Sequence, residues 1–270
     1  MNAGIFGPGY APVATPAPLL GMPTPVPTPG SQVMLPPTVV PYLAAWWDAA
    51  DDSTVTLNSG NVSQLRDKSG LGNHLSQATA NNQPLYGRGA INGRNALTFS
   101  TTNHRLISSS FTVSKPCVFS VWRVRSGYSA GASKAPIIWD TFSAGNRCVH
   151  YVQENSSTAL LYAKDDGGSG KVASSSVVFG RTYVSFCASA ANVGHSLFLN
   201  GVKGIDATAG TTGFSGISLG NLRGNPSPGA PNYNFDGQLC EFIVYSQPPS
   251  DAHRIGIERY LGAKWGAVVA

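Results

Sequence analysis

FDGQLCEFIVY, residues 235–245, is the stretch that decides the fold of this chain of 270 residues. Most of its side chains are apolar, and Val, Ile, Phe and Tyr favour extended strands. Pro248 and Pro249 follow it, and proline cannot donate a backbone hydrogen bond to a sheet. The stretch therefore predicts a buried strand that ends before these prolines.

A helix is predicted directly after the prolines, over residues 250–265. Ser250 is a favoured N-cap residue. Ile257, Leu261 and Trp265 recur at every fourth position, which places them on one face of a helix. This apolar ridge indicates a helix that packs against a sheet.

Short apolar runs separated by Gly, Asn and Ser fill the region between residue 42 and this last strand. Asn200-Gly201 lies between two such runs and is a strong signal for a two-residue hairpin turn. Many short strands with one helix predict an all-β fold, a two-sheet antiparallel sandwich of jelly-roll type. The runs predicted as strands are Ala96–Phe99, Val118–Val124, Ile137–Trp139, Cys148–Val152, Thr158–Tyr162, Thr182–Ala188, His195–Leu199, Ile217–Leu219 and Leu239–Tyr245.

The N-terminal segment, residues 1–41, differs in composition from the rest. It contains no Asp, Glu, Lys or Arg, and 11 of the chain's 19 prolines lie between Pro8 and Pro41. Because proline fixes φ and lacks a backbone donor, we expect an extended arm, partly in polyproline II conformation. The globular domain is then expected over residues 42–270.

Two interpretations of this arm stay open. It can be a linker, or it can anchor the domain on a partner subunit, since apolar residues on a proline-stiffened strand lose little entropy when they dock. The anchoring side chains are then Ile5, Phe6, Tyr10, Leu19, Leu20, Met34 and Leu35.

Charged residues make up 11% of the chain, and 18 basic and 13 acidic residues give a net charge of +5. The basic residues are scattered, which disfavours nucleic-acid binding. No apolar run is long enough to span a membrane, and the N-terminus lacks the basic and apolar regions of a signal peptide. We therefore expect a protein made in the cytoplasm, without membrane insertion.

The four cysteines are far apart and show no Cys-x-x-Cys pairing. Each lies in or beside an apolar run, which favours buried thiols, although one or two disulfides stay open as an alternative. The wide spacing disfavours a metal site. The cysteines are Cys117, Cys148, Cys187 and Cys240.

Three further motifs accompany the strand at residues 235–245: AWWDA at 45–49, QLRDKSGLGN at 64–73 and YLGAKWG at 260–266. Together they resemble the concanavalin A-like, laminin G-type β-sandwich domains found in many bacteriophage structural proteins and bacterial surface proteins. The resemblance spans roughly residues 42–265. It implies the sandwich fold and, at Glu241, a glutamate with a structural role, which we expect to bond buried backbone.

The carboxylates do not form the motif of a glycoside hydrolase. Such enzymes need two carboxyl groups that flank the scissile bond, and the Glu-x-Asp-x-x-Glu strand motif of glucanases with this shape is missing. His150-Tyr151 is similar to the base and acid of polysaccharide lyases, but adjacent residues of a strand point to opposite faces. We expect no enzyme, no catalytic residue and no cofactor.

Calcium and glycans are the ligands that stay open. Laminin G-type domains often hold one calcium ion at the rim of the sandwich, for which the candidates are Asp140, Asp165 and Asp206. A glycan site would use aromatic rings that stack on sugars and amides that bind hydroxyl groups, with burial in the core as the alternative for each ring. The candidates for glycan contact are Tyr128, Trp139, Asn225 and Tyr233.

The resemblance, the uncharged arm and the missing catalytic motif together predict a non-enzymatic structural protein of a virion. We expect a capsid decoration protein or a head or tail appendage subunit that forms a homo-oligomer and is anchored by its arm to other virion proteins. The alternative is a carbohydrate-binding receptor-recognition module or adhesin of the tail-fibre type, which binds host surface glycans. A polysaccharide-degrading enzyme is the third and least favoured function.

Overall fold

The computed structural model describes residues 33–100, 103–114, 116–126, 136–141, 148–155, 158–165, 172–190, 194–204, 214–221 and 234–270. The chain divides into two units, residues 1–32 and residues 33–270, and only the second contains described residues. Five of the expected anchoring residues therefore lie outside the described part: Ile5, Phe6, Tyr10, Leu19 and Leu20.

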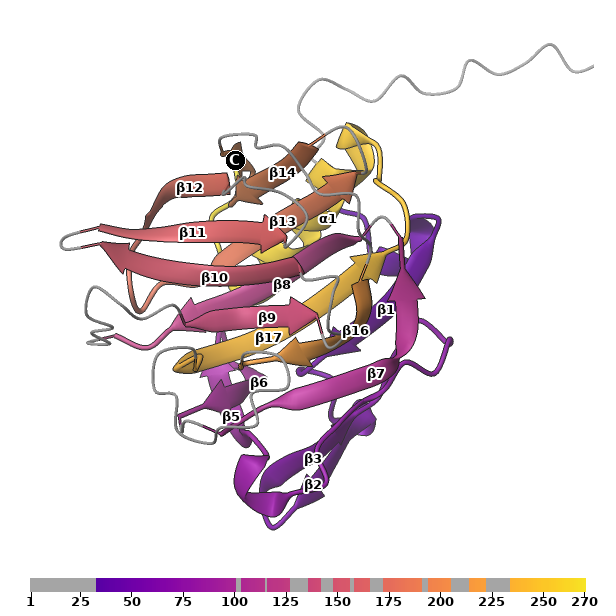
Figure 1. Ribbon diagram of the computed structural model, residues 1–270, viewed down its shortest axis with the longest axis vertical. Helices are drawn as coiled ribbons and strands as arrows, with labels where there is room; N and C mark the ends of the chain where they lie inside the picture. The colour runs from indigo at the N-terminus through magenta and orange to yellow at the C-terminus, as the bar shows by residue number, and fades with distance from the viewer. Residues whose placement is uncertain are drawn as a thin grey trace, which may run out of the picture. The chain divides into compact units, whose positions relative to one another are not determined.

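Antiparallel β-sheet makes up most of the described chain, and one α-helix, α1 (Asp251–Trp265), closes it at the C-terminal end (Figure 1). This architecture is consistent with the predicted all-β sandwich. The strands are β1 (Leu43–Asp48), β2 (Val55–Asn58), β3 (Asn61–Leu65), β4 (Leu75–Ser76), β5 (Leu85–Ile91), β6 (Arg94–Phe99), β7 (Leu106–Val113), β8 (Cys117–Val124), β9 (Ile137–Thr141), β10 (Cys148–Asn155), β11 (Thr158–Asp165), β12 (Val172–Val177), β13 (Tyr183–Ala190), β14 (Gly194–Leu199), β15 (Val202–Lys203), β16 (Phe214–Leu219) and β17 (Gly237–Tyr245). Three short 3₁₀ helices accompany them: η1 (Pro37–Val39), η2 (Asp52–Thr54) and η3 (Ala80–Asn82).

The strand pairing builds two layers. In the first layer β17 lies between β1 and β8, and β13, β14 and β15 follow beyond β8. In the second layer β7, β16, β9, β10, β11 and β12 are neighbours in that order. β3, β4, β5 and β6 connect the two layers at one end, so the pairing continues from one to the other.

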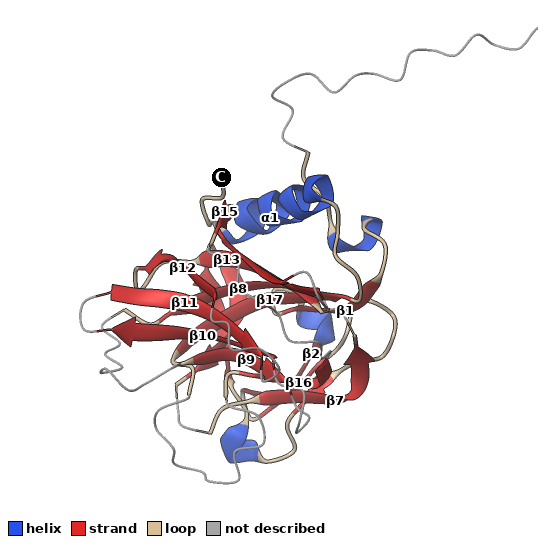
Figure 2. Cartoon of the chain, turned by 45° about the horizontal axis from the view of Figure 1, so that its top comes forward, coloured by secondary structure: helices blue, strands red, loops and turns tan. Residues whose placement is uncertain are grey.

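Apolar side chains fill both sides of the first layer. The larger cluster lies between the layers, where Trp122 of β8 and Trp139 of β9 are both fully buried. A second cluster lies on the opposite face of β8, β13 and β17, which α1 covers (Figure 2). The first layer is therefore buried on both faces, and its strands are almost continuously apolar for that reason.

The predicted helix is confirmed. Ser250 caps it, since its hydroxyl group accepts a hydrogen bond from the His253 N–H at 3.2 Å. The ridge of Ile257, Leu261 and Trp265 is buried against the first layer. No helix among the described residues is long and apolar enough to cross a membrane.

The predicted hairpin turn at Asn200-Gly201 is also confirmed. Both residues have positive φ, +50° and +82°, as a type I′ turn requires, and the turn joins β14 to β15. Ser59-Gly60 and Asn92-Gly93 make the same kind of turn between β2 and β3 and between β5 and β6. These two turns were not predicted from the sequence.

The last part of the expected arm, residues 33–41, packs on its own chain. The Leu35 N–H donates to the carbonyl oxygen of Gly256 in α1 at 3.0 Å. The Tyr245 hydroxyl group donates to the carbonyl oxygen of Pro37 at 2.9 Å, and Val40 is buried. Met34, the other described residue proposed as an anchor, is 56% exposed.

We expect Leu261→Ala to lower the free energy of unfolding by about 2–5 kcal/mol, because this side chain of α1 is fully buried against the first layer. Leu71→Ala is the matched control: Leu71 is 64% exposed, and its loss should cost less than about 0.5 kcal/mol. Urea unfolding followed by circular dichroism measures both. Equal effects would show that α1 is not part of the core.

Candidate functional site

A β-bulge in β17 directs Glu241 toward α1. Leu239 pairs with Trp122 and Glu241 pairs with Val121, so Cys240 is an extra residue in this strand. Leu239 consequently belongs to the cluster between the layers, whereas Glu241 shares a face with Val121 and α1. Simple alternation along the strand does not predict this arrangement.

Glu241 lies in a buried network with Asp48 and Lys264. The Lys264 ammonium is 2.7 Å from a Glu241 carboxylate oxygen and 2.7 Å from an Asp48 carboxylate oxygen. The indole N–H groups of Trp46 and Trp265 donate to the two Glu241 oxygens at 2.8 and 2.7 Å. Glu241 is therefore structural, but its partners are side chains and not the backbone groups that we expected.

Burial shapes the electrostatics of this network. Loss of hydration raises the pKa of Glu241, and the neighbouring Asp48 carboxylate raises it further. Burial by itself would lower the pKa of Lys264, but the carboxylates of Glu241 and Asp48 outweigh that effect and keep its pKa above the ordinary value. The ammonium group therefore stays charged between the two acids, and Lys68 provides Asp48 with a second cation.

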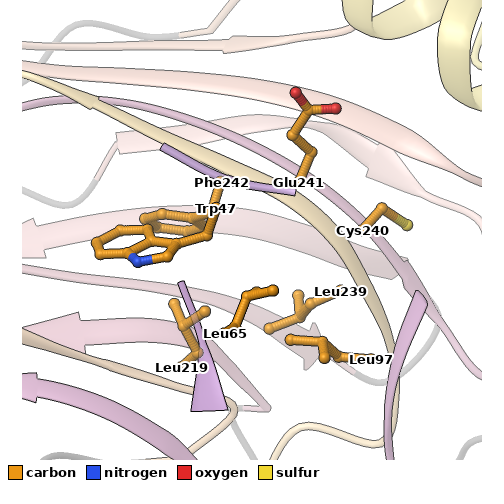
Figure 3. A pocket seen from close by; sticks show the side chains of 8 residues that line it. All are labelled: Trp47, Leu65, Leu97, Leu219, Leu239, Cys240, Glu241 and Phe242. Carbon is orange, nitrogen blue, oxygen red and sulfur yellow. The ribbon is translucent and has the colours of Figure 1, made fainter. Parts of the chain in front are cut away.

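This acidic pair has no space for a substrate. The hollow beside Glu241 has a volume of about 10 Å³, and Leu65, Leu97 and Leu239 are among its mainly apolar lining. Figure 3 shows that the Glu241 carboxylate points away from these leucines. Two carboxylates that flank a sugar need an open cleft, so Asp48 and Glu241 do not form a glycosidase site.

Lys264→Met should lower the free energy of unfolding by about 3–5 kcal/mol, because it leaves the buried Glu241 carboxylate without its cation and Asp48 with Lys68 alone. Lys68→Met is the matched control, since Lys68 contacts Asp48 and Asp51 from a more exposed position. We expect a loss of about 1 kcal/mol there. Urea unfolding at neutral pH compares the two variants, and a smaller loss for Lys264→Met would contradict this account.

The loop formed by residues 64–73 is hydrogen-bonded to β1. The Asp67 carboxylate accepts hydrogen bonds from the backbone N–H groups of Trp46, Ser69 and Asn73, at 2.9, 2.8 and 3.0 Å. The Trp47 indole donates to the carbonyl oxygen of Asn73. Because backbone groups occupy this carboxylate, the motif is structural.

His150 and Trp139 lie inside the sandwich. Trp139 is fully buried, stacks edge-on against Phe242 and donates its indole N–H to His150 at 3.0 Å. Trp139 is therefore not available as a glycan contact. Burial lowers the pKa of His150 to about 3, and Tyr151 belongs to a separate cluster with Val149. His150 and Tyr151 therefore do not form the acid–base pair of a lyase.

The described residues contain no group of three or more His, Cys, Asp or Glu side chains that could hold a metal ion. Asp140 is buried in β9, whereas the side chain of Asp165 and all of Asp206 lie outside the described part.

Four buried cysteines are present as thiols: Cys117, Cys148, Cys187 and Cys240. Three of the predicted glycan contacts also lie outside the described residues: Tyr128, Asn225 and Tyr233.

An open groove of about 360 Å³ lies where the N-terminal end of α1 meets β13, β14 and β15. Its walls combine aromatic rings, prolines, a hydroxyl group and three charged side chains. Pro248 and Lys203 are exposed, whereas Phe186 is buried with its ring 6.0 Å from that of Phe198. The lining residues are Phe186, Ala188, Ser196, Phe198, Lys203, Pro248, Pro249, Asp251 and Arg254.

Arg254 connects this groove to a buried acid. Its guanidinium group lies over the Phe198 ring, 3.9 Å from the ring centre. It also pairs with Glu258 at 2.5 Å and lies 3.4 Å from Asp251. Burial raises the pKa of Glu258 to about 7, against the opposing effect of Arg254. The groove thus has a carboxyl group behind it that titrates near neutral pH.

Glu258→Gln should change how stability depends on pH. The folded protein keeps the Glu258 proton up to about pH 7, whereas the unfolded chain releases it near pH 4.5. The stabilisation from this proton is complete below pH 4.5 and is lost as pH rises through 7. Between those pH values the wild type should therefore lose about 2–3 kcal/mol relative to Glu258→Gln. Urea unfolding across this range tests it, and parallel pH profiles would contradict it.

This groove was not predicted from the sequence. Pro248 and Pro249 indicated only the end of a strand, Asp251 lay within the helix predicted over residues 250–265, and the strand predicted at His195–Leu199 gave no functional meaning to Phe198. A chain segment from the first layer and one from α1 meet there. The one available signal was an aromatic residue beside a hairpin turn, which is too common to be specific.

Comparison with solved structures identifies proteins of similar fold. Trypanosoma rangeli sialidase, in complex with the inhibitor DANA, matches 87% of this chain and 36% of its own chain, with a TM-score of 0.56 and 11% identity. An arabinofuranosidase complexed with arabinofuranosyl-α-1,2-xylobiose matches 86% of this chain and 61% of its own, with a TM-score of 0.56 and 14% identity. Domain 4 of a GH43 extracellular arabinanase from Geobacillus stearothermophilus, in complex with arabinotriose, matches 79% of this chain and 98% of its own, with a TM-score of 0.50 and 12% identity.

At these identities the likeness shows the fold alone. This chain spans only about a third of the sialidase and three fifths of the arabinofuranosidase. No protein-family model matches the sequence, and no curated protein matches it.

These comparisons correct the functional expectation from the sequence. The resemblance led us to expect a virion structural subunit with a phage-type role, whereas these structural neighbours act on or bind carbohydrates. The virion function is therefore wrong. The error arose because the motifs at residues 45–49, 64–73 and 260–266 support the packing of the sandwich, and sandwich packing does not specify function.

Proposed function

We propose that this protein is a non-catalytic carbohydrate-binding domain and that the groove beside α1 is its binding site. The observation that carries this proposal is the lining of the groove, which brings apolar ring surfaces and hydrogen-bonding side chains into one open hollow of about 360 Å³. Pockets for small ligands commonly have volumes of about 300–1,000 Å³. The groove therefore accommodates one or a few sugar units.

The two kinds of lining match the two kinds of surface on a sugar. The C–H faces of a sugar ring pack on flat apolar groups, for which Pro248, Pro249 and the edge of Phe198 are available. Sugar hydroxyl groups both donate and accept hydrogen bonds. Lys203 supplies donors and Asp251 supplies acceptors at the groove.

The comparison with the arabinanase supports a binding role. The matched part is a single domain, this chain covers nearly all of it, and that domain is described in complex with arabinotriose. A domain of this size and fold can thus hold an oligosaccharide. The partial coverage of the sialidase and the arabinofuranosidase fits a domain that works beside a catalytic one.

The carboxylates of the groove support a role without catalysis. Hydrolysis of a glycosidic bond ordinarily needs two carboxyl groups on either side of that bond. Asp251 is the one carboxylate among the described lining residues, and Glu258 is buried behind Arg254. No described pair can therefore flank a bound sugar in this groove.

We also keep the finer fold assignment as a proposal, namely a concanavalin A-like sandwich of jelly-roll type preceded by a proline-rich arm. The two packed layers and the structural role of Glu241 support it. The proline content of residues 1–41 supports the arm.

The proposal is tested by screening the full chain against a glycan array that includes arabinotriose, followed by titration calorimetry with a glycan that binds. Lys203→Ala should weaken binding about tenfold, because it removes a charged hydrogen-bond donor from the groove. Phe198→Leu should weaken it by a similar factor, since leucine keeps the apolar volume but removes the ring.

Arg88→Ala is the control for Lys203→Ala, because Arg88 is an exposed cation on β5 that does not line the groove. It should leave the affinity unchanged. Absence of binding to any glycan would refute the function. Binding that neither groove variant weakens would place the site elsewhere.

A further inference from the structure

The guanidinium group of Arg254 is only partly used by its own chain. Nη1 pairs with Glu258, and Nε faces Asp251 at the long distance of 3.4 Å. The remaining nitrogen, Nη2, makes no hydrogen bond among the described residues, although the group lines an open groove. Guanidinium N–H groups form strong charge-assisted hydrogen bonds with carboxylates, so Nη2 is suited to an acidic ligand.

Stacking on Phe198 keeps this group in place. The guanidinium carbon lies over the aromatic ring, 3.9 Å from its centre, and the side chain is only 9% exposed. A held guanidinium loses little side-chain entropy when a ligand binds, and burial strengthens its charge–charge interactions. Lys203, on the other wall, supplies a second cation. Together they outnumber Asp251, the one carboxylate among the described residues that line the groove.

We propose that the groove selects an acidic saccharide, whose carboxylate binds Arg254 with help from Lys203, and that Glu258 makes this binding dependent on pH. This inference rests on the proposed carbohydrate-binding function and adds the class of the ligand. Three observations support it: the guanidinium group of Arg254 is only partly bonded, Lys203 is a second cation at the groove, and the buried Glu258 competes with a ligand for Arg254.

Glu258 competes with the ligand when it is ionised. Burial places its pKa near 7, so the carboxyl group is neutral in mildly acidic solution and charged in mildly basic solution. When it is charged, it neutralises Arg254 and repels an incoming carboxylate. When it is neutral, the charge of Arg254 acts on the ligand. Affinity should thus fall as pH rises through 7.

Among the described residues, few other charged groups act on this carboxyl group. Arg254 and Asp251 belong to α1 itself. From β13 and β14 the groove receives Phe186, Ala188, Ser196 and Phe198, which do not titrate, and from β15 it receives Lys203. β8 also packs under α1, but its Arg123 bonds to Gln238 and to the carbonyl oxygen of Ala90, and burial keeps its Cys117 thiol protonated by raising the pKa.

The test compares acidic sugars with neutral sugars of the same shape. Trigalacturonic acid is paired with its methyl ester, and sialyllactose is paired with the methyl ester of its sialic acid. Calorimetry with the full chain at pH 6 and pH 8 measures each affinity. At pH 6 at least one acidic sugar should bind about tenfold more tightly than its neutral counterpart, and this advantage should shrink by up to about tenfold at pH 8, as expected for a competing group with a pKa near 7.

Glu258→Gln separates this mechanism from a general charge effect. The variant keeps a polar side chain of the same size but cannot ionise, so it should bind the acidic sugar equally well at pH 6 and pH 8. Calorimetry at pH 7 in two buffers of different ionisation enthalpy should detect proton uptake on binding for the wild type and none for Glu258→Gln. Arg88→Ala, which removes an exposed cation away from the groove, should behave as the wild type does.

The outcomes distinguish the two proposals. If neither acidic sugar binds more tightly than its neutral counterpart while a neutral glycan binds in the groove, the preference for acidic ligands is wrong and the carbohydrate-binding function stands. If the acidic preference is present but Glu258→Gln keeps the pH dependence, the role of Glu258 is wrong. If no glycan binds at all, both proposals fail.

Discussion

Lys264, placed between Asp48 and Glu241, is the constraint on which the arrangement of this domain depends. The two carboxylates come from β1 and β17, and the lysine comes from the last turn of α1. A buried charge without a partner is costly, so β1, β17 and α1 must pack in the one arrangement that brings these three side chains together. The indoles of Trp46 and Trp265 complete the site by occupying the remaining directions around Glu241.

This network fixes the C-terminal end of α1, and the apolar ridge of Ile257 and Leu261 fixes its middle. Its N-terminal end is consequently held beside β13 and β14, where the groove lies. The part of the helix that carries the stability and the part that lines the groove are thus at opposite ends. Side chains at the groove can therefore change without disturbing the network of Lys264, Asp48 and Glu241.

The groove proposed to bind sugars lies away from the positions at which the sequence suggested glycan contacts. Aromatic residues attract attention as sugar contacts, yet Trp139 is part of the core because a large ring fills space between two layers. At the groove the ring of Phe198 is shared between a guanidinium group and the opening. The two rings differ in their surroundings, and those surroundings come from distant parts of the chain.

The sequence by itself determined the local elements: the apolar strands, the hairpin at Asn200-Gly201 and the capped helix after Ser250. These follow from preferences that act between near neighbours, and they were sufficient to predict an all-β fold with one helix. Only the tertiary structure decided that Cys240 forms a bulge, that Lys264 meets Asp48, and that Arg254 meets Phe198. Those contacts join residues that are distant in the chain. They depend on the register and packing of whole layers, which no local pattern encodes.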